Sequence, residues 1–357
     1  MIYLLLLSAI PLIFTVGNSL SMRVVRSKFA EKVETSVSIL VPMRNEERNV
    51  DGVLTSLLSS MHLAHSELIV LDDYSSDSTA ALLGNYPGAQ VHSGIELPNY
   101  WLGKNFACHQ LVTHSTGQYL VFVDADVRVA PSAIAASITY MNSMGWDFIS
   151  PYPRQIAETF LERLIQPLLQ WSWLSSVPLR YAEQGKFPSM IIANGQFMII
   201  KRGAYIKAGG HKAIRSEVLD DLELARLLTK SGFKGGVADG SEVAACRMYQ
   251  NASELSAGYT KSLWRAFGSA SGSLLTSIYL FSTGVLPFIL ALSGFRAAWV
   301  GYFLVVLSRC VSALRTRSTP SAALLHPLSI LTLIALIAWS WQQKLTHQLV
   351  WRGRSVG

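Results

Sequence analysis

Two aspartates follow an apolar segment near the middle of the chain, and their side chains have the chemistry of a metal site. Residues 119–123 read Tyr-Leu-Val-Phe-Val and predict a buried strand, after which Asp124 and Asp126 flank Ala125. Ligands of open α/β sheets bind at the carboxyl ends of strands. Carboxylate oxygens there suit Mg²⁺ or Mn²⁺, which is usually shared with substrate phosphates. The motif predicts a site for a divalent cation and a phosphate ester, although two surface aspartates after a strand explain the same residues.

Polar side chains also follow the first predicted strand. The apolar run 37–41 ends at Pro42, and Asn45 and Glu46 precede a segment with helical periodicity at 48–60. This order places the three residues near the sheet edge, so we expect Pro42, Asn45 and Glu46 to contact a bound nucleotide. An ordinary helix start, with Asn45 as its N-cap, explains the same pattern.

A third acidic cluster ends the strand predicted at 67–71. Asp72 and Asp73 follow this run directly. A carboxylate at this position accepts hydrogen bonds from ribose hydroxyls or from a base N–H, and we assign that contact to Asp73. We expect Asp77 and Ser78 to cap the helix that follows.

One lysine and one pair of acids complete the charged clusters. Gly103 lets the backbone approach a ligand and Lys104 brings a positive charge to a phosphate, although a solvated lysine in a turn explains the pair as well. Asp220 and Asp221 open a predicted helix, where the helix dipole alone stabilises acids. The functional interpretation is a general base that takes the proton of an acceptor hydroxyl while cations stabilise a departing diphosphate.

Strand-like and helix-like segments alternate from about residue 36 to residue 250, which predicts an α/β sheet. A helix rich in Leu and Trp at 160–179 belongs either to a protein core or to a membrane interface. The remaining expected elements are helices at 78–83, 104–114 and 220–231 and a long strand at 190–201 that is broken by Gly195.

The composition separates a soluble part from a membrane part. The 357 residues are 50% hydrophobic and 15% charged, whereas soluble domains carry about 25% charged residues. Beyond Glu254 the chain has nine Lys/Arg and no Asp or Glu, which leaves 21 basic and 23 acidic residues before that point. The basic excess therefore indicates attraction to anionic lipid headgroups and excludes a nucleic-acid footprint. The three cysteines form no C-x-x-C pair, which fits a reduced, cytosol-facing domain.

Four apolar segments predict membrane helices. Residues 1–20 are followed, not preceded, by basic residues, which favours a retained anchor with a cytosolic C-terminal end over a signal peptide. Three more lie near 273–293, 297–314 and 323–341, and Arg309 in the second must face protein or snorkel. Three full crossings would leave the basic chain end outside, so one segment is re-entrant or interfacial. The expected organisation is an anchor at 1–22, a catalytic domain at 36–255 with an interfacial helix at 160–180, membrane segments at 270–342 and a basic tail at 343–357.

Together these residues resemble the family 2 glycosyltransferases, which are inverting enzymes with a Rossmann-like, A-type nucleotide-sugar transferase fold. The resemblance covers about residues 36–250. It implies that Asp73 holds the uracil or the ribose and that Asp221 is the catalytic base. It also implies that Asp124 lies beside the nucleotide and that Asp126 binds the metal, Mg²⁺ or Mn²⁺. The order that carries it is Pro42, Asn45-Glu46, Asp72-Asp73, Lys104, Asp124-Ala125-Asp126 and Asp220-Asp221, in which Asp220 stands where the family usually has Glu.

Two regions leave their roles open. Processive polysaccharide synthases of this family carry Gln-x-x-Arg-Trp, but here the region reads Lys261-Ser-Leu-Trp264-Arg265, so that Trp264 either stacks on a sugar or lies at a membrane interface. Asn194 and Gln196 offer hydrogen bonds to a sugar. His211 either has a structural role in its Gly-rich loop or assists the base or a phosphate.

The layout also resembles bacterial enzymes that glycosylate carotenoid acids or hopanoids and, more distantly, ceramide glucosyltransferases. We expect a multi-pass cell-membrane enzyme with its catalytic domain facing the cytoplasm. It would move one sugar from a nucleoside-diphosphate donor, expected to be UDP-linked, to a lipid or isoprenoid acceptor that enters between the 160–179 helix and the C-terminal spans. The alternatives are a processive polysaccharide synthase and a non-catalytic membrane scaffold with a transferase fold.

Overall fold

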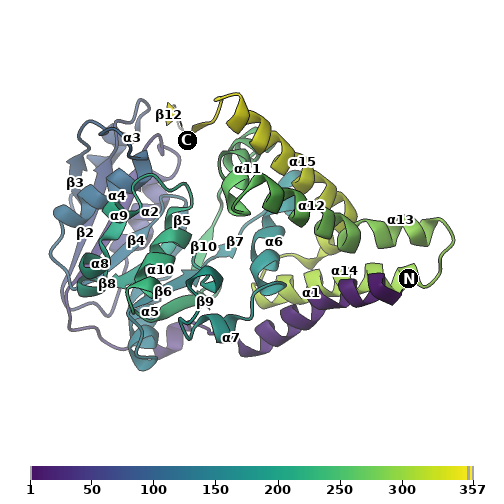
Figure 1. The fold of residues 1–357 in the computed structure, drawn as a ribbon. Coiled ribbons are helices and arrows are strands. Elements are labelled where there is room, and N and C mark those ends of the chain that lie inside the picture. The colour runs from purple at the N-terminus through teal and green to yellow at the C-terminus, as the bar shows by residue number, and fades with distance from the viewer. Residues whose placement is uncertain (1, 352–353, 356–357) are drawn as a thin grey trace. The chain divides into compact units, whose positions relative to one another are not determined.

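The chain folds into two compact units (Figure 1). A computed structural model describes residues 2–351 and 354–355, so residues 352, 353, 356 and 357 of the expected basic tail lie outside the described residues. The helical unit comprises Met1–Met22, Gln155–Arg180 and Arg247–Gly357, and the sheet unit comprises Arg23–Arg154 and Tyr181–Cys246. The segment 155–180, which was expected inside a continuous 36–255 domain, thus groups with the two ends of the chain.

The sheet unit, which is fully described, is built on a mixed seven-stranded sheet with the order β3-β2-β1-β4-β8-β6-β9. β8 is antiparallel to both of its neighbours, while the other strands run in one direction. The residues just before β8 therefore lie at the same edge as the carboxyl end of β4. The strands are β1 (Val37–Met43), β2 (Ser66–Asp72), β3 (Gln90–Ser93), β4 (Tyr119–Val123), β6 (Phe148–Tyr152), β8 (Phe197–Lys201) and β9 (Gly235–Asp239).

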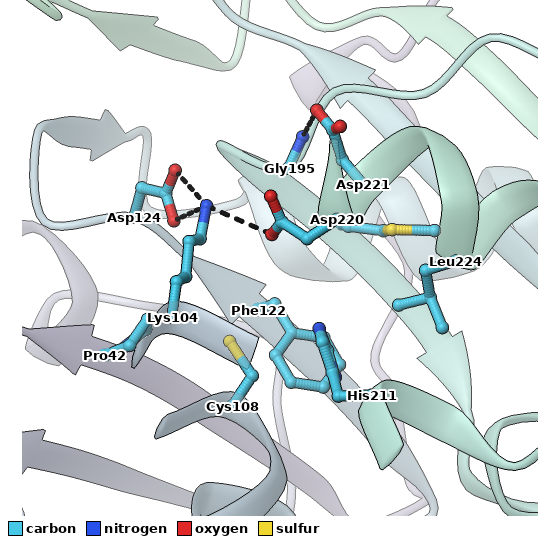
Figure 2. A pocket seen from close by; sticks show the side chains of 11 residues that line it. Pro42, Lys104, Cys108, Phe122, Asp124, Gly195, His211, Asp220, Asp221 and Leu224 are labelled. Atoms are coloured by element: carbon cyan, nitrogen blue, oxygen red, sulfur yellow. Dashed lines mark hydrogen bonds and ion pairs between the residues drawn. The ribbon is translucent and has the colours of Figure 1, made fainter. Parts of the chain in front are cut away.

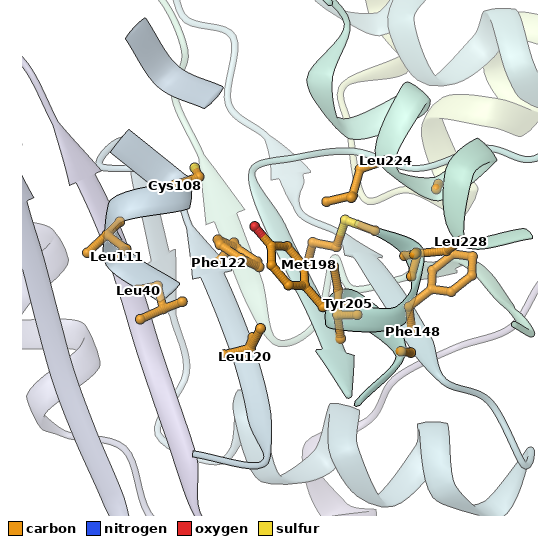
Figure 3. Close-up of a cluster of buried hydrophobic side chains, with 14 of the residues drawn as sticks. Leu40, Cys108, Leu111, Leu120, Phe122, Phe148, Met198, Tyr205, Leu224 and Leu228 are labelled. Atoms are coloured by element: carbon orange, nitrogen blue, oxygen red, sulfur yellow. The ribbon is translucent and has the colours of Figure 1, made fainter. Parts of the chain in front are cut away.

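A buried apolar cluster joins one face of this sheet to three helices (Figure 3). The helices are α4 (Gly103–Thr113), α8 (Arg202–Ala208) and α10 (Asp220–Lys230). Alternate residues of β4 and β8 face this cluster because successive side chains of a strand point to opposite faces. Each fully buried large side chain stabilises the fold by about 1.5–3 kcal/mol. The cluster thereby fixes where α4 and α10 begin. Its members include Leu111, Leu120, Phe122, Met198, Ile200, Tyr205, Leu224 and Leu228.

Most of the elements that the sequence predicted for the sheet unit are present, although several others, such as α5 (Ala133–Ser143) and β3, were not predicted. The strand at 119–123 has the predicted bounds, and the helix expected within 48–60 is α2 (Val50–Leu58). The long strand expected at 190–201 is wrong in its first half, because β8 begins only at Phe197 and residues 191–196 form irregular backbone. β6 and β9 escaped prediction, since Pro151 and the pair Gly235-Gly236 are poor strand signals.

In the described part of the helical unit, four segments are long and apolar enough to cross a membrane: Ile2–Ser21, Ala270–Leu292, Ala298–Arg315 and Pro320–Leu345. They correspond to α1 (Ile2–Ser21), α12 with α13 (Ala270–Gly284 and Leu286–Leu292), α14 (Ala298–Arg315) and the 3-10 turn η3 with α15 (Pro320–Leu325 and His326–Leu345). The unit also contains α6 (Phe160–Leu174) and α11 (Ala252–Ala266). Trp171 and Trp173 of α6 are buried, so these two side chains belong to the protein core.

The first helix packs along α14 in parallel, as Figure 1 also shows. The hydroxyl groups of Thr15 and Ser308 are 2.9 Å apart, and Arg315 donates a hydrogen bond of 3.1 Å to the carbonyl of Ser19. Residue numbers rise together along both helices at these contacts. The C-terminal end of α1, which leads into the sheet unit, therefore lies beside the C-terminal end of α14.

Helix α15 runs antiparallel to α12. The indole of Trp341 donates to the hydroxyl of Ser273 at 2.9 Å, whereas a Cβ atom on Gly284 would lie 2.8 Å from Nε2 of His326. His326 also lies 3.3 Å from a guanidinium nitrogen of the buried Arg309, so this arginine faces protein. Helix α15 consequently starts at the depth of Arg309 in α14 and ends beside the first turn of α12.

Candidate active site

A pocket opens at the sheet edge where β1 and β4 end and where α4 and α10 begin (Figure 2). The polypeptide just before β8 forms its remaining wall. Four residues expected at the site line it, together with Asp220 and several residues that the sequence did not single out. The lining comprises Pro42, Lys104, Cys108, Phe122, Asp124, Gly195, Met198, His211, Asp220, Asp221 and Leu224.

Lys104 lies between two carboxylates in this pocket. Its ammonium nitrogen is 2.9 Å from each carboxylate oxygen of Asp124 and 3.5 Å from an oxygen of Asp220 (Figure 2). Burial disfavours the charge of Lys104, but the two carboxylates outweigh burial and hold its pKa well above the usual value. The lysine is therefore a permanent cation at the sheet edge, paired with two carboxylates although its side chain is partly exposed.

Asp221 is held by backbone amides. The N–H of Gly195 donates to one carboxylate oxygen at 2.8 Å, and the N–H of Leu222 donates to the other at 2.7 Å. The absence of a side chain at residue 195 allows this approach, because a Cβ atom there would lie 3.0 Å from Cβ of Asp221. Burial, followed by the negative charge of Asp220, raises the pKa of Asp221 to about 6. A carboxylate with this pKa and a fixed orientation has the properties of a general base.

Asp126 lies beside the pocket lining in a cluster of carboxylates. Burial, then Asp124 and then Glu46 raise its pKa to about 7. Its Oδ1 atom is buried and accepts no hydrogen bond among the described residues. A buried oxygen without a donor next to two further carboxylates fits a hard cation. The described residues contain no group of three His, Cys, Asp or Glu side chains arranged to hold a metal ion.

Arg128 fixes the turn that carries Asp124 and Asp126, and sequence reasoning missed it. One guanidinium nitrogen donates to the carbonyls of Ala125 and Val127, both at 2.9 Å. The side chain passes over Gly52 of α2, where a Cβ atom would overlap the guanidinium group. A glycine inside a predicted helix is the sequence signal that could have pointed to this close approach.

The nucleotide-side residues Asn45, Glu46 and Asp73 do not line the pocket. Asn45 has a positive φ of 53°, and its side-chain carbonyl accepts a hydrogen bond of 2.8 Å from the N–H of Ser76. Glu46 accepts a hydrogen bond of 2.8 Å from the side chain of Asn49, and Asn49 is the N-cap position of α2. The interpretation of Asn45 as the helix N-cap is therefore wrong. These residues instead tie the loop after β1 to the loop after β2.

Asp73 and Asp77 have different surroundings in the loop after β2. Asp73 is buried, its N–H donates to the carbonyl of Met43 at 2.8 Å, and its own carbonyl accepts a hydrogen bond of 2.5 Å from Arg44. Asp77 accepts a hydrogen bond of 3.0 Å from the N–H of Thr79, the first residue of α3 (Thr79–Leu83). The expected capping is confirmed for Asp77 but is wrong for Ser78, which occupies the N-cap position without a side-chain capping hydrogen bond. The ligand contact assigned to Asp73 stays a prediction.

The two polar residues expected to bind a sugar are engaged elsewhere. The side chain of Asn194 accepts a hydrogen bond of 2.9 Å from the N–H of Gln196, and the Gln196 amide donates to the sulfur of Cys246 at 3.0 Å. Gln196 is also buried. The segment 191–196 contributes its backbone to the pocket, through Gly195. Trp264 belongs to the helical unit, where its indole donates to the carbonyl of Lys261 and Lys344 lies 4.5 Å above its ring.

Comparisons with known proteins agree with this geometry. Residues 38–209 match the family model described as Glycosyl transferase family 2. The 4,4'-diaponeurosporenoate glycosyltransferases of Staphylococcus aureus strains MRSA252 and USA300 are 27% and 26% identical over 337 residues, which cover 89% of this chain and 88% of each relative. A mannosyltransferase from Pyrobaculum calidifontis, solved in complex with GDP-Man and Mn²⁺, has a similar fold with a TM-score of 0.53 and 16% identity, over 95% of this chain and 99% of that chain.

The mixed sheet with charged residues at its edge is a GT-A-type fold, as the sequence led us to expect, and the chain is a glycosyltransferase. The match to glycosyl transferase family 2 covers residues 38–209. The N-terminal helix and the C-terminal helices are candidate membrane spans.

Proposed function

We propose that this glycosyltransferase moves one sugar, with inversion, from a UDP-linked donor to a lipid or isoprenoid acceptor. The observation that carries the proposal is the position of Asp221 beside Lys104 at the sheet edge, where a base and a cation line one pocket. The named acceptor of the Staphylococcus aureus relatives and the apolar helices of this chain support a water-insoluble acceptor.

Each charged side chain has a role in a single displacement. Asp221 takes the proton of an acceptor hydroxyl as the acceptor oxygen bonds to the anomeric carbon. The bond from that carbon to the phosphate oxygen breaks, and its electron pair leaves with the diphosphate. Lys104 contributes positive charge next to the leaving group. Attack from the face opposite the leaving group inverts the anomeric carbon.

Asp126 would supply an oxygen ligand for a divalent cation in this proposal, because its Oδ1 is buried without a donor, while Asp124 lies beside the nucleotide. When bound, Mg²⁺ or Mn²⁺ balances negative charge on the diphosphate. Pro42, Asn45, Glu46 and Asp73 are proposed to contact the nucleotide, since all four belong to β1 or to the loops after β1 and β2.

The proposed location is the cell membrane, with several crossings and with the sheet unit facing the cytoplasm. Most basic residues after Glu254, apart from Arg296 in the loop after α13 and the buried Arg309, favour a cytoplasmic location for the segments that carry them. The acceptor is proposed to reach the enzyme through the helical unit, between α6 and the C-terminal helices.

The full chain, reconstituted in lipid nanodiscs with Mn²⁺, tests the proposal. We would offer labelled UDP-glucose or GDP-mannose with a carotenoid acid, a hopanoid or a ceramide, and identify products by mass spectrometry. Asp221→Asn should retain donor binding and lose transfer to a hydroxyl by about 10³-fold or more. A ladder of products would indicate a polysaccharide synthase. If neither donor binds, the chain acts as a scaffold and the proposal is wrong. If Asp221→Asn transfers the sugar at the wild-type rate, the assignment of Asp221 as the base is wrong.

A further inference from the structure

His211 lines the pocket through an unusual turn in the chain. It belongs to α9 (Gly210–Ala213), and the two glycines before it have φ values of 95° at Gly209 and 52° at Gly210. A Cβ atom on Gly210 would overlap the ring of Tyr205. The two glycines therefore allow this turn to pack closely against Tyr205. His211 is only 3% exposed, and its ring makes an edge-on contact with Phe122 (Figure 2).

Tyr205 fixes which ring nitrogen of His211 carries the proton. The phenol oxygen accepts a hydrogen bond of 3.0 Å from the backbone N–H of His211 and lies 2.9 Å from Nδ1 of the same residue. Within the fully described sheet unit, Nδ1 is the one acceptor in reach of the buried phenol proton. A buried hydroxyl without an acceptor costs about 1–3 kcal/mol, so the phenol donates to Nδ1 and the imidazole proton resides on Nε2.

The imidazole is neutral at physiological pH. Burial, opposed by the carboxylate of Asp220 and aided by the ammonium group of Lys104, lowers the pKa of His211 to about 4. Nε2 of His211 has no hydrogen-bond partner among the residues that the structure describes. The pocket therefore contains an uncharged N–H donor with a fixed direction and no protein acceptor, on a side chain that is almost fully buried.

The surroundings of His211 favour one kind of ligand oxygen. Phe122, Met198 and Leu224 make this side of the pocket apolar, while Asp220 adds negative charge near the imidazole. A phosphate oxygen would be repelled by that charge and has Lys104 as a better partner. An uncharged hydroxyl suits a neutral donor on an apolar wall.

We propose that Nε2–H of His211 donates to one hydroxyl oxygen of the transferred sugar, between the leaving diphosphate near Lys104 and the base Asp221. The inference rests on the proposed function, because it requires a nucleotide-sugar donor. His211 is then a residue that selects and positions the sugar, and Tyr205 acts through it by holding its tautomer.

Binding of UDP-glucose and of UDP to the full chain with Mn²⁺ separates a sugar contact from a phosphate contact. His211→Phe should weaken UDP-glucose binding about tenfold, the effect of losing one hydrogen bond, and leave UDP binding unchanged. His211→Gln places an amide N–H near the position of Nε2 and should restore most of the affinity. Analogues of UDP-glucose that each lack one hydroxyl add a stricter criterion. One analogue should bind the wild type about tenfold more weakly and be insensitive to His211→Phe.

The free protein allows a second test. Nitrogen-15 NMR of labelled histidine should show His211 as the Nε2–H tautomer from pH 6 to pH 8, and Tyr205→Phe should abolish this preference. An Nδ1–H tautomer, or an equal loss of UDP and UDP-glucose affinity in His211→Phe, would overturn the inference. Unchanged UDP-glucose binding in that variant would overturn it while the proposed function stands. If the wild type binds no nucleotide sugar at all, both are wrong.

Discussion

The ammonium nitrogen of Lys104 lies 2.9 Å from both carboxylate oxygens of Asp124. The residue that should meet the leaving diphosphate and the first acid of the metal motif are thus bound to each other in the structure. In the proposed function, the diphosphate would compete with Asp124 for the ammonium group of Lys104.

Replacing Lys104 by Met should weaken donor binding and slow transfer. The change removes a charge-assisted contact to phosphate, which is worth about 1.5–3 kcal/mol, or roughly 10- to 100-fold. Isothermal titration with UDP measures the loss. Lys201→Met is a matched control, since Lys201 pairs with Asp147 at 3.2 Å at similar exposure but away from the pocket. An equal loss in both variants would show that Lys104 only supports the fold.

The rate of transfer to a hydroxyl should rise with pH through about 6. Asp221 acts only when it is deprotonated, and its pKa is raised to about 6 by burial and by Asp220. Below this pH, kcat/KM should fall about tenfold per pH unit. Asp220→Asn removes the second cause and should therefore shift the profile to lower pH. Product release followed from pH 4.5 to pH 8.5 checks both statements, and a shift in the opposite direction would contradict this role of Asp220.

Gly195→Ala should impair catalysis without unfolding the sheet unit. The new methyl group would lie 3.0 Å from Cβ of Asp221 and 3.5 Å from the nitrogen of Lys104, so the base must move by a few tenths of an ångström. We expect kcat to fall about 10- to 100-fold. Gly203→Ala is the matched control, because no atom lies within 4 Å of its new methyl group. Thermal unfolding should show both variants folded, and normal kcat in Gly195→Ala would contradict the tight fit.

Asp126→Asn should raise the concentration of Mn²⁺ that gives half-maximal activity by about a hundredfold or more. Mutation of residues that only hydrogen-bond to metal ligands already lowers metal affinity about 10- to 100-fold. Chelation by EDTA should stop transfer by the wild type, and added Mn²⁺ should restore it. Asp51→Asn, an exposed change on α2, is the control. If Asp126→Asn needs no more Mn²⁺ than the wild type, the assignment of Asp126 as a metal ligand is wrong.

The last apolar segment should not cross the membrane. Helix α15 starts at the depth of Arg309 and ends beside Ser273, so Thr319 and Thr346 should lie on the same side as the sheet unit. Single cysteines at these two positions, in a variant without the native cysteines, should react with an impermeant maleimide from that side. A cysteine at Ser293 should react only from the other side. If the cysteine at position 346 reacts from the same side as the cysteine at position 293, α15 crosses the membrane.

The sequence was sufficient for the charged groups but not for their exact surroundings. Asp124, Lys104 and Asp221 could be placed at strand ends or helix starts from local pattern, because each adjoins an apolar segment of clear period. The antiparallel insertion of β8 could not be predicted, since strand order depends on long-range packing. That insertion brings Gly195 to Asp221 and Gln196 to Asp124.

The role of His211 also could not be predicted from local sequence. Its spacing from two glycines suggested a structural role or a ligand contact, and nothing local decides between them. The structure adds a hydrogen bond with Tyr205, six residues earlier, in a turn that contains the positive φ values of both glycines. Likewise, the apolar segment 323–341 has the composition of a span, and only its contacts with α12 reveal where it begins and ends.

The parallel contact of α1 with α14 has a consequence for how the protein is made. Thr15 and Ser308 are separated by 293 positions in the sequence, so the first helix leaves the ribosome long before its partner exists. At about 5–20 residues per second, this delay lasts roughly 15–60 s. During that time the hydroxyl of Thr15 lacks the partner that it has in the folded helical unit, whereas Asn18 can already pair with residues 174–179. The helical unit is therefore completed only at the end of synthesis, after the whole sheet unit has emerged.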